Sequence, residues 1–241
     1  MKRVHWYTDH KTGCILSKRI MSQIPIPMGF DHKVFFLFLN QEIPESEKCV
    51  IIIRHPKDII ISGYLYHKKC SEVWCNTDGG KYYGGYTLKI NEGLKDYYNR
   101  GNNFSNPKSY KSILKSLPQE EGIIHEMNHV AKHTIDGMYN LMHYKKPNVL
   151  ILKYEDLVFR HDITLTRLCQ FLEIEEKNIN SIVNKCRGHN LLSQKENQKL
   201  TNHTTNKKVD KDRYKEYWSE NIEREFKKLF PKDVLSKFNY E

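Results

Sequence analysis

A short turn near the N-terminus carries residue types that bind phosphate. The segment HKTGC, at residues 10–14, follows an apolar run and precedes a helical pattern. In a strand–turn–helix unit, the N–H groups of the turn and of the helix start point at a bound anion, and the helix dipole favours negative charge there. Lys11 adds a mobile positive charge. The turn predicts a phosphate cradle, although an ordinary strand-to-helix turn is compatible with the same residues.

A second pair of polar residues lies at the end of another apolar run, CVIII at residues 49–53. Arg54 ends this run, Pro56 and Asp58 begin a helical pattern, and Ser62 lies two turns into it. Arginine offers a fork of donors to a phosphate, and serine adds a hydroxyl. A helix that leaves a strand end keeps Ser62 near the same side of the sheet, so the pair predicts a second anion site. Taken singly, each residue also fits a purely structural role.

The elements that must position these residues follow from the spacing of apolar side chains. Four short β-rich runs indicate buried strands at Val4 to Tyr7, Val34 to Leu39, Val50 to Ile53 and Val149 to Leu152. Helical patterns cover Ile59 to Lys69, Ile123 to Met142, Leu165 to Leu172, Ile179 to Cys186 and Ile222 to Leu229. Strands that alternate with helices predict an α/β fold with a parallel sheet, and such sheets bind ligands at the carboxyl ends of their strands.

The length of 241 residues suits one α/β domain, so we expect a single domain over residues 1–241. The stretch 70–118 departs from the pattern, because it holds GGKYYGGY and a dense group of tyrosines. It is too long for an ordinary connection. We expect either a functional lid or a poorly ordered insert there.

The composition narrows the partners and the compartment. A net charge of +10 suggests an anionic partner, such as a phosphorylated small molecule, an acidic membrane surface or nucleic acid. No nucleic-acid motif accompanies the charge, so we expect no nucleic-acid partner, although tyrosines among basic residues could stack bases. Six scattered cysteines without a CxxC pair favour a reducing compartment. We find no signal peptide and no transmembrane segment, and we expect a cytoplasmic protein.

Taken together, these motifs resemble the nucleotide-binding signatures of the sulfotransferase family. KTG resembles the family's PKSGTTW loop, and RHPKDIIISGY resembles its strand-end arginine followed eight residues later by serine. LILKYEDLV, at residues 150–158, is similar to the family's strand ending in YEDL, and SYKSILKSLPQEEGIIHEM, at residues 109–127, is similar to a segment of bacterial members. The resemblance runs from about Arg3 to Trp218.

The resemblance implies a P-loop-NTPase-like three-layer α/β sandwich with a central parallel sheet. It implies transfer of a sulfuryl group from 3′-phosphoadenosine 5′-phosphosulfate (PAPS) to an acceptor hydroxyl or amine, with adenosine 3′,5′-bisphosphate (PAP) as product and no metal. We expect the acceptor to be a carbohydrate or another hydroxyl compound, and we expect the insert at 70–118 to serve the acceptor side of the site. The implied donor-binding residues are Lys11, Thr12, Gly13, Cys14, Ile15, Arg54, Ser62, Tyr154, Lys207 and Lys208. In this assignment the turn binds the 5′-phosphosulfate, Arg54 and Ser62 bind the 3′-phosphate, and Tyr154 lies near the adenine.

The chain departs from the family pattern at two places. Cys14 and Ile15 stand where the family usually has two threonines, so hydroxyl contacts are lost and backbone N–H groups must hold the phosphate. The family's C-terminal Arg-Lys-Gly signature appears only as Lys207-Lys208-Val209. Both basic positions are kept, and the glycine is not.

The catalytic base is predicted from its position in the family, just after the second strand. The corresponding text is FLFLNQEIP, which places Glu42 at that position. Sulfuryl transfer needs the acceptor proton removed and charge on the leaving oxygen offset, so we expect Glu42 to be the base and Lys11 to serve the leaving group. His32 and Asp31 precede the same strand and rank below Glu42.

One motif favours a different class of enzyme. His125, Glu126 and His129 form an HExxH pattern, with His133 one turn further, and histidines at i and i+4 could hold zinc beside a glutamate base. A zinc hydrolase is therefore the rival hypothesis. A nucleotide-dependent kinase is a second alternative, but we find no convincing set of Mg²⁺ ligands near the turn.

Overall fold

The structure is a computed structural model that describes residues 4–25, 45–78, 108–142, 146–193 and 211–240. The chain groups into two compact units. Unit 1 comprises Met1–Arg54 and Gly137–Lys199, and unit 2 comprises His55–Asp136 and Leu200–Glu241. Each unit is therefore discontinuous in sequence, and each is described below by itself.

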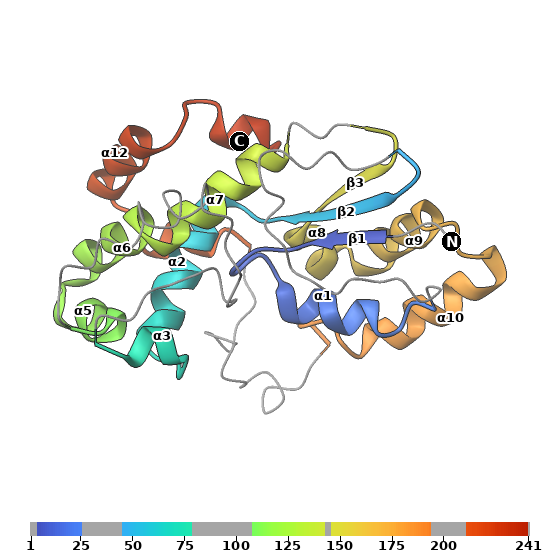
Figure 1. The fold of residues 1–241 in the computed structure, drawn as a ribbon, viewed down its shortest axis with the longest axis horizontal. Coiled ribbons are helices and arrows are strands. Elements are labelled where there is room, and N and C mark those ends of the chain that lie inside the picture. The colour runs from blue at the N-terminus through green and yellow to red at the C-terminus, as the bar shows by residue number, and fades with distance from the viewer. Residues whose placement is uncertain (1–3, 26–44, 79–107, 143–145, 194–210, 241) are drawn as a thin grey trace. The chain divides into compact units, whose positions relative to one another are not determined.

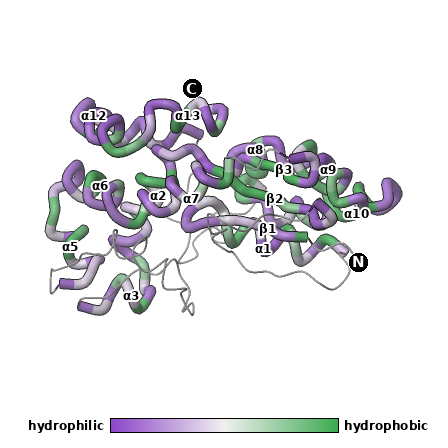
Figure 2. The backbone as a smooth tube through the Cα atoms, turned by 45° about the horizontal axis from the view of Figure 1, so that its top comes forward, coloured by the Kyte–Doolittle hydropathy of each residue, from purple (hydrophilic) through white to green (hydrophobic). Residues whose placement is uncertain are grey.

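Unit 1 is built on a parallel sheet of three described strands, in the order β1-β2-β3 (Figure 1). The strands are β1 (Val4–Tyr7), β2 (Lys48–Ile53) and β3 (Val149–Lys153). In β2 every residue after Lys48 is buried, and Figure 2 shows this strand as a hydrophobic stretch. A central parallel strand is covered on both faces, which is why it consists of consecutive β-branched residues rather than an alternating pattern.

Four helices of unit 1 flank the sheet: α1 (Cys14–Met21), α8 (Tyr154–Phe159), α9 (His161–Phe171) and α10 (Glu176–Arg187). Helix α9 packs against β3, α8 and α10. The buried side of α10 consists of apolar residues at helical spacing, namely Ile179, Ile182, Val183 and Cys186. Helix α1 starts directly after the turn that follows β1, so the strand ends on the residues predicted to bind phosphate (Figure 1).

Unit 2 is helical in its described part. Its elements are α2 (Pro56–His67), α3 (Val73–Asn76), α5 (Tyr110–Ser116), α6 (Gln119–Asn128), η1 (Arg213–Glu216), α12 (Glu220–Leu229) and α13 (Val234–Lys237). Helix α2 packs against α5, α6 and η1 and is buried along nearly its whole length. Helix α7 (Val130–Leu141) begins in this unit and ends in unit 1.

The first turn of α2 is held by the C-terminal part of unit 2. The Nζ of Lys57 lies 2.6 Å from a carboxylate oxygen of Glu223 and 5.1–5.5 Å from the ring centroids of Tyr214, Trp218 and Phe226. The Trp218 indole donates to the same Glu223 oxygen over 2.6 Å. A desolvated ammonium is stabilised by aromatic faces and a counter-charge together. This lysine therefore joins α2 to α12.

The comparison with the predicted elements gives one correction. The predicted strands at Val4, Val50 and Val149 are confirmed as β1, β2 and β3, whereas the one predicted at Val34 to Leu39 lies outside the described residues. The pattern from Ile123 to Met142 was wrong as one helix, because α6 ends at Asn128 and His129 adopts φ −119° and ψ −99°. The predicted insert 70–118 contains the unpredicted helices α3 and α5 in its described part. None of the described helices is long and apolar enough to cross a membrane.

Candidate donor-binding site

The turn after β1 is organised around the carbonyl oxygen of Asp9. This oxygen accepts hydrogen bonds from the backbone N–H of Thr12 (3.1 Å), from the Thr12 hydroxyl (2.8 Å) and from the Cys14 thiol (2.9 Å). The Thr12 hydroxyl oxygen in turn accepts from the N–H of Asp9 over 2.7 Å. Thr12 is completely buried, so its side chain holds the turn closed rather than reaching for a ligand.

Two residues of this turn have left-handed backbone conformations. Lys11 has a φ of 63° and Gly13 a φ of 105°. Gly13 directly precedes α1 and provides no side-chain cap, and the first turn of α1 holds no acidic residue. The first N–H groups of a helix have no intrahelical partner, and the helix dipole is positive at this end. A helix start without a side-chain cap therefore suits a bound anion. The residues of the turn fit an anion, and the phosphate cradle stays a prediction.

Arg54 and Tyr154 complete the back of the turn. A terminal nitrogen of Arg54 donates to the carbonyl oxygen of Lys11 over 2.8 Å, and the guanidinium lies 4.7 Å from the centroid of the Tyr154 ring. A Cβ on Gly13 would come within 2.6 Å of the same ring. The Tyr154 ring therefore contacts both Gly13 and Arg54. Three segments far apart in sequence meet here, at the carboxyl ends of β1, β2 and β3.

Arg54 retains hydrogen-bonding capacity in this arrangement. Its Nε is buried and has no hydrogen-bond partner within the described part of the chain. A buried guanidinium nitrogen without a partner is costly, and an anion would satisfy it. The residues present therefore fit a phosphorylated ligand.

The side chains of Cys14 and Ile15 offer no hydroxyl group to an anion. Burial is the main cause that raises the pKa of the Cys14 thiol, so the group stays protonated and donates to Asp9. The Ile15 side chain is partly exposed. If a phosphate binds here, it is held by backbone N–H groups and not by these side chains.

Of the remaining residues predicted to bind PAPS, the structure describes Ser62 but not Lys207 or Lys208. Ser62 lies in the middle of α2, is 7% exposed and belongs to unit 2. Glu42, Lys207 and Lys208 lie outside the described residues, as do Asp31 and His32.

The HExxH pattern does not form the arrangement that a zinc hydrolase needs. The Glu126 side chain is completely buried, and one of its oxygens lies 2.8 Å from Nδ1 of His67 and accepts from the Tyr110 hydroxyl over 2.8 Å. His129 lies in the break between α6 and α7. No group of three metal-ligating side chains occurs among the residues that the structure describes. Glu126 is thus engaged by His67 and Tyr110 rather than available as a general base.

The rings of His125 and His129 lie 4.0 Å apart, centroid to centroid. Burial is the main cause that lowers the pKa of His125 to about 4, and the neighbouring His129 adds to the effect. Burial similarly lowers the pKa of His133 to about 4. Both side chains are therefore neutral near pH 7.

Comparison with known proteins decides the family. The model of the sulfotransferase domain matches residues 17–240. The chain belongs to the sulfotransferase domain family. The match covers both units of this sulfotransferase domain and begins after the Lys11–Cys14 turn, so the assignment of that turn rests on its geometry.

A solved structure supports the fold of the sulfotransferase domain. The mouse sulfotransferase SULT7A1, complexed with PAP, matches with a TM-score of 0.50 and 15% sequence identity, over 100% of this chain and 86% of the mouse chain. The comparison with curated proteins finds no match. The predicted α/β fold with a central parallel sheet and the predicted sulfotransferase activity are confirmed, and neither the hydrolase nor the kinase alternative gains support.

Sequence reasoning missed the contacts that hold this site of the sulfotransferase domain together. The Arg54 bond to the Lys11 carbonyl joins two predicted residues through a backbone atom, which no motif records. The engagement of Glu126 by His67 and Tyr110 was also missed. The one available signal was that His67 lies within the apolar helical pattern Ile59 to Lys69, where a polar side chain needs a buried partner.

Proposed function

We propose that this sulfotransferase domain takes its sulfuryl group from PAPS and that the turn after β1 binds the 5′-phosphosulfate. The observation that carries the proposal is the Arg54 bond to the Lys11 carbonyl, with Tyr154 packed against both Arg54 and Gly13. It joins the phosphate turn, the strand-end arginine and the YEDL tyrosine of unit 1. The PAP bound to the mouse sulfotransferase is the product that such a donor would leave.

Arg54 and Ser62 are proposed to bind the 3′-phosphate. The eight-residue spacing between them is that of the family signature, and the unpartnered Nε of Arg54 supplies a donor. Lys207 and Lys208 are proposed to add positive charge to the same phosphate. Tyr154 is proposed to lie near the adenine, where its ring already provides an aromatic surface.

PAPS, when bound, supplies an activated sulfuryl group whose bond to the 5′-phosphate breaks as the acceptor oxygen or nitrogen bonds to sulfur. Glu42 is proposed to accept the proton of the acceptor. Lys11 is proposed to offset the negative charge that develops on the leaving phosphate. The N–H groups at the start of α1 hold that phosphate in place, and this scheme needs no metal.

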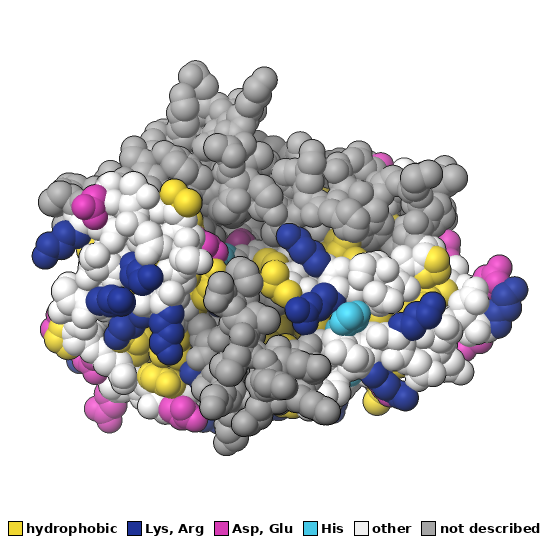
Figure 3. Space-filling view, turned by 90° about the horizontal axis from the view of Figure 1, so that it is seen from below, with side chains coloured by type: hydrophobic (Ala, Val, Ile, Leu, Met, Phe, Trp, Pro, Cys, Tyr) yellow, Lys and Arg dark blue, Asp and Glu magenta, His cyan; other side chains and the backbone are white. Residues whose placement is uncertain are grey.

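The acceptor is proposed to be a carbohydrate or another hydroxyl compound, bound by the insert at 70–118 within a single domain over residues 1–241. Figure 3 shows several Lys and Arg side chains close together at the left of the view. Exposed lysines of this insert and its border include Lys69, Lys108 and Lys115. Positive charge of this kind suits an acidic acceptor.

We propose the cytoplasm as the compartment. All six cysteines are free, and five of them are buried. Free thiols persist in a reducing environment.

Calorimetry with PAP in the presence of a chelator tests the donor assignment. PAP should bind to the metal-free protein with one site per chain, and AMP should bind more weakly because it lacks the 3′-phosphate. Transfer of radiolabelled sulfate from PAPS to a panel of acidic carbohydrates should likewise survive chelation. Absence of PAP binding, or binding that requires zinc, would contradict the proposed donor.

A further inference from the structure

Glu126 is a buried carboxylate that the donor-binding scheme does not use. It lies on α6 with 0% exposure, and one oxygen, Oε2, is contacted by His67 and Tyr110 at 2.8 Å each. Its other oxygen, Oε1, has no hydrogen-bond partner within the described residues. Burying a carboxylate that is only half satisfied is costly. The position of the group therefore calls for an explanation beyond packing.

The second oxygen of Glu126 lies against the backbone of α2. A Cβ built on Gly63 would stand 2.3 Å from Oε1 and 3.0 Å from the carboxyl carbon. Only glycine leaves room for the carboxylate at this point. Gly63 directly follows Ser62, the residue proposed to bind the 3′-phosphate.

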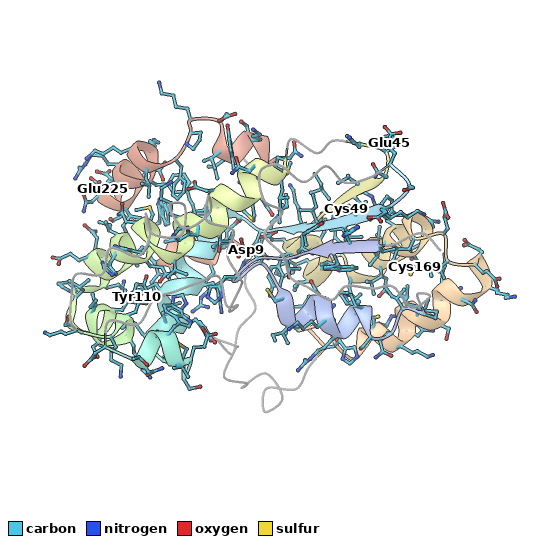
Figure 4. The ribbon with its side chains drawn as sticks, viewed as in Figure 1. Asp9, Glu45, Cys49, Tyr110, Cys169 and Glu225 are labelled. Carbon is cyan, nitrogen blue, oxygen red and sulfur yellow. The ribbon has the colours of Figure 1, made fainter. Side chains whose placement is uncertain are left out.

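The two contacts of Glu126 with α2 are one helical turn apart. Gly63 and His67 are separated by four residues, so they lie on the same face of the helix. Tyr110, labelled in Figure 4 among the helices of unit 2, fixes the carboxylate from α5. A helix that is held at two points on one face can neither rotate about its axis nor slide along it without breaking one of the contacts.

We propose that Glu126 is a positioning residue for Ser62, which acts through Gly63 and His67 to hold α2 in the rotation that presents the Ser62 hydroxyl to the 3′-phosphate of the donor. This inference rests on the proposed donor site. It gives the central glutamate of the HExxH pattern a role in a sulfotransferase that involves no metal.

The test is a double-mutant cycle read out by the affinity for PAP and for AMP. Ser62→Ala alone should weaken PAP about tenfold or more, because a hydrogen bond to a charged group is lost. Glu126→Gln keeps the side-chain volume but places an amide where two donors converge. It should weaken PAP about fivefold to twentyfold, on the scale of a single hydrogen bond, and leave AMP unchanged. In the Ser62→Ala background, Glu126→Gln should cause almost no further loss, because residues that act through one contact are not additive.

Further variants separate the positioning role of Glu126 from a general loss of stability. Ile135→Val removes one methyl group from a completely buried residue of α7 and should lower stability without changing the ratio of PAP to AMP affinity. Gly63→Ala should displace the carboxylate and reproduce the selective loss of PAP affinity. Gly188→Ala is its control, because a Cβ there meets nothing within 4 Å.

If Glu126→Gln does not fold, Tyr110→Phe removes one donor to the same oxygen and carries the same test.

The outcomes distinguish a failure of the positioning role of Glu126 from a failure of the proposed donor site. Equal losses of PAP and AMP affinity in Glu126→Gln, or losses that add fully to those of Ser62→Ala, would overturn the positioning role while leaving the donor site intact. A Ser62→Ala protein with unchanged PAP affinity would overturn the proposed role of Ser62 in binding the 3′-phosphate, and with it the positioning role of Glu126.

Discussion

The turn after β1 in unit 1 and the Glu126 network of unit 2 use polar groups in opposite ways. Around the turn, polar groups brace one another but leave donors open, as at the start of α1 and at the Nε of Arg54. Around Glu126, the charged group is enclosed by His67, Tyr110 and the backbone of Gly63. Open donors mark a place for a ligand, whereas enclosed groups mark a place where helices are held in register. Motif matching alone does not distinguish the two cases.

The largest expected effect concerns the catalytic base, which we place in neither region. Glu42→Gln cannot accept a proton and should lower turnover by roughly 10²–10⁴. PAP affinity should hardly change, because the proposed base acts on the acceptor and not on the donor. Steady-state rates with a sulfated product as readout check this prediction. Glu45→Gln is the matched control, since it changes an exposed carboxylate three residues further along. Near-normal turnover in Glu42→Gln would move the base elsewhere.

Removal of the arginine tests whether the open donors of unit 1 serve a ligand. Arg54→Ala should weaken PAP by roughly 2–5 kcal/mol, as expected for a charge pair that loses one partner. AMP should lose much less, because only the bond to the Lys11 carbonyl is then missing. Calorimetry of both nucleotides measures the difference. The control is Arg187→Ala, which removes an exposed arginine that pairs with Asp162. Equal losses for PAP and AMP would mean that Arg54 only braces the turn.

The third prediction concerns the backbone of the same turn. Gly13→Ala should destabilise the protein by about 2 kcal/mol, because an L-residue in a left-handed conformation costs about 1–2 kcal/mol and the added Cβ meets the Tyr154 ring. PAP affinity should fall with it, since the start of α1 shifts. Urea unfolding and calorimetry together report both effects. Gly188→Ala should leave both quantities nearly unchanged, because its φ is −64° and the space around it is open.

The smallest expected effect is on the pH dependence of stability, through the buried His133 of unit 2. His133 has a pKa of about 4 in the folded protein, whereas an unfolded histidine titrates near 6.5. Between these values the unfolded state binds more protons, so stability should fall as pH is lowered from about 6.5 toward 4. His133→Gln should show a shallower fall in urea unfolding free energy between pH 7 and pH 5. Parallel pH profiles of the two proteins would argue that His133 is accessible to protons.

The sequence predicted the fold well because the decisive pattern is local. Consecutive β-branched residues such as Val50 to Ile53 define a central parallel strand without knowledge of its neighbours. The turn between β1 and α1 was predictable for the same reason, since its glycine and lysine lie between one strand and one helix, whereas its phosphate ligand stays a prediction. The break at His129 was not predictable, because the apolar spacing continues across it while the backbone does not.

Contacts between distant segments were beyond the sequence. The role of Glu126 depends on residues 59 positions earlier and 16 positions earlier, and no spacing rule connects them. The pattern HExxH is defined by side-chain types on one helix. What decides its chemistry is whether the glutamate reaches solvent, and that is set by α2 and α5.

The pairing of Lys57 with Glu223 has a consequence for how the protein is made. The two residues are 166 positions apart, and the rings around Lys57 all lie in the segment from Tyr214 to Phe226. During synthesis, α2 leaves the ribosome long before Glu223, the counter-ion of Lys57, has been made. Domains generally fold as units, so α2 has to be completed by residues that are synthesised later. Lys57 can therefore acquire these partners only after the segment from Tyr214 to Phe226 has been synthesised. A premature stop near residue 210 would remove little mass but leave that ammonium without any of its partners.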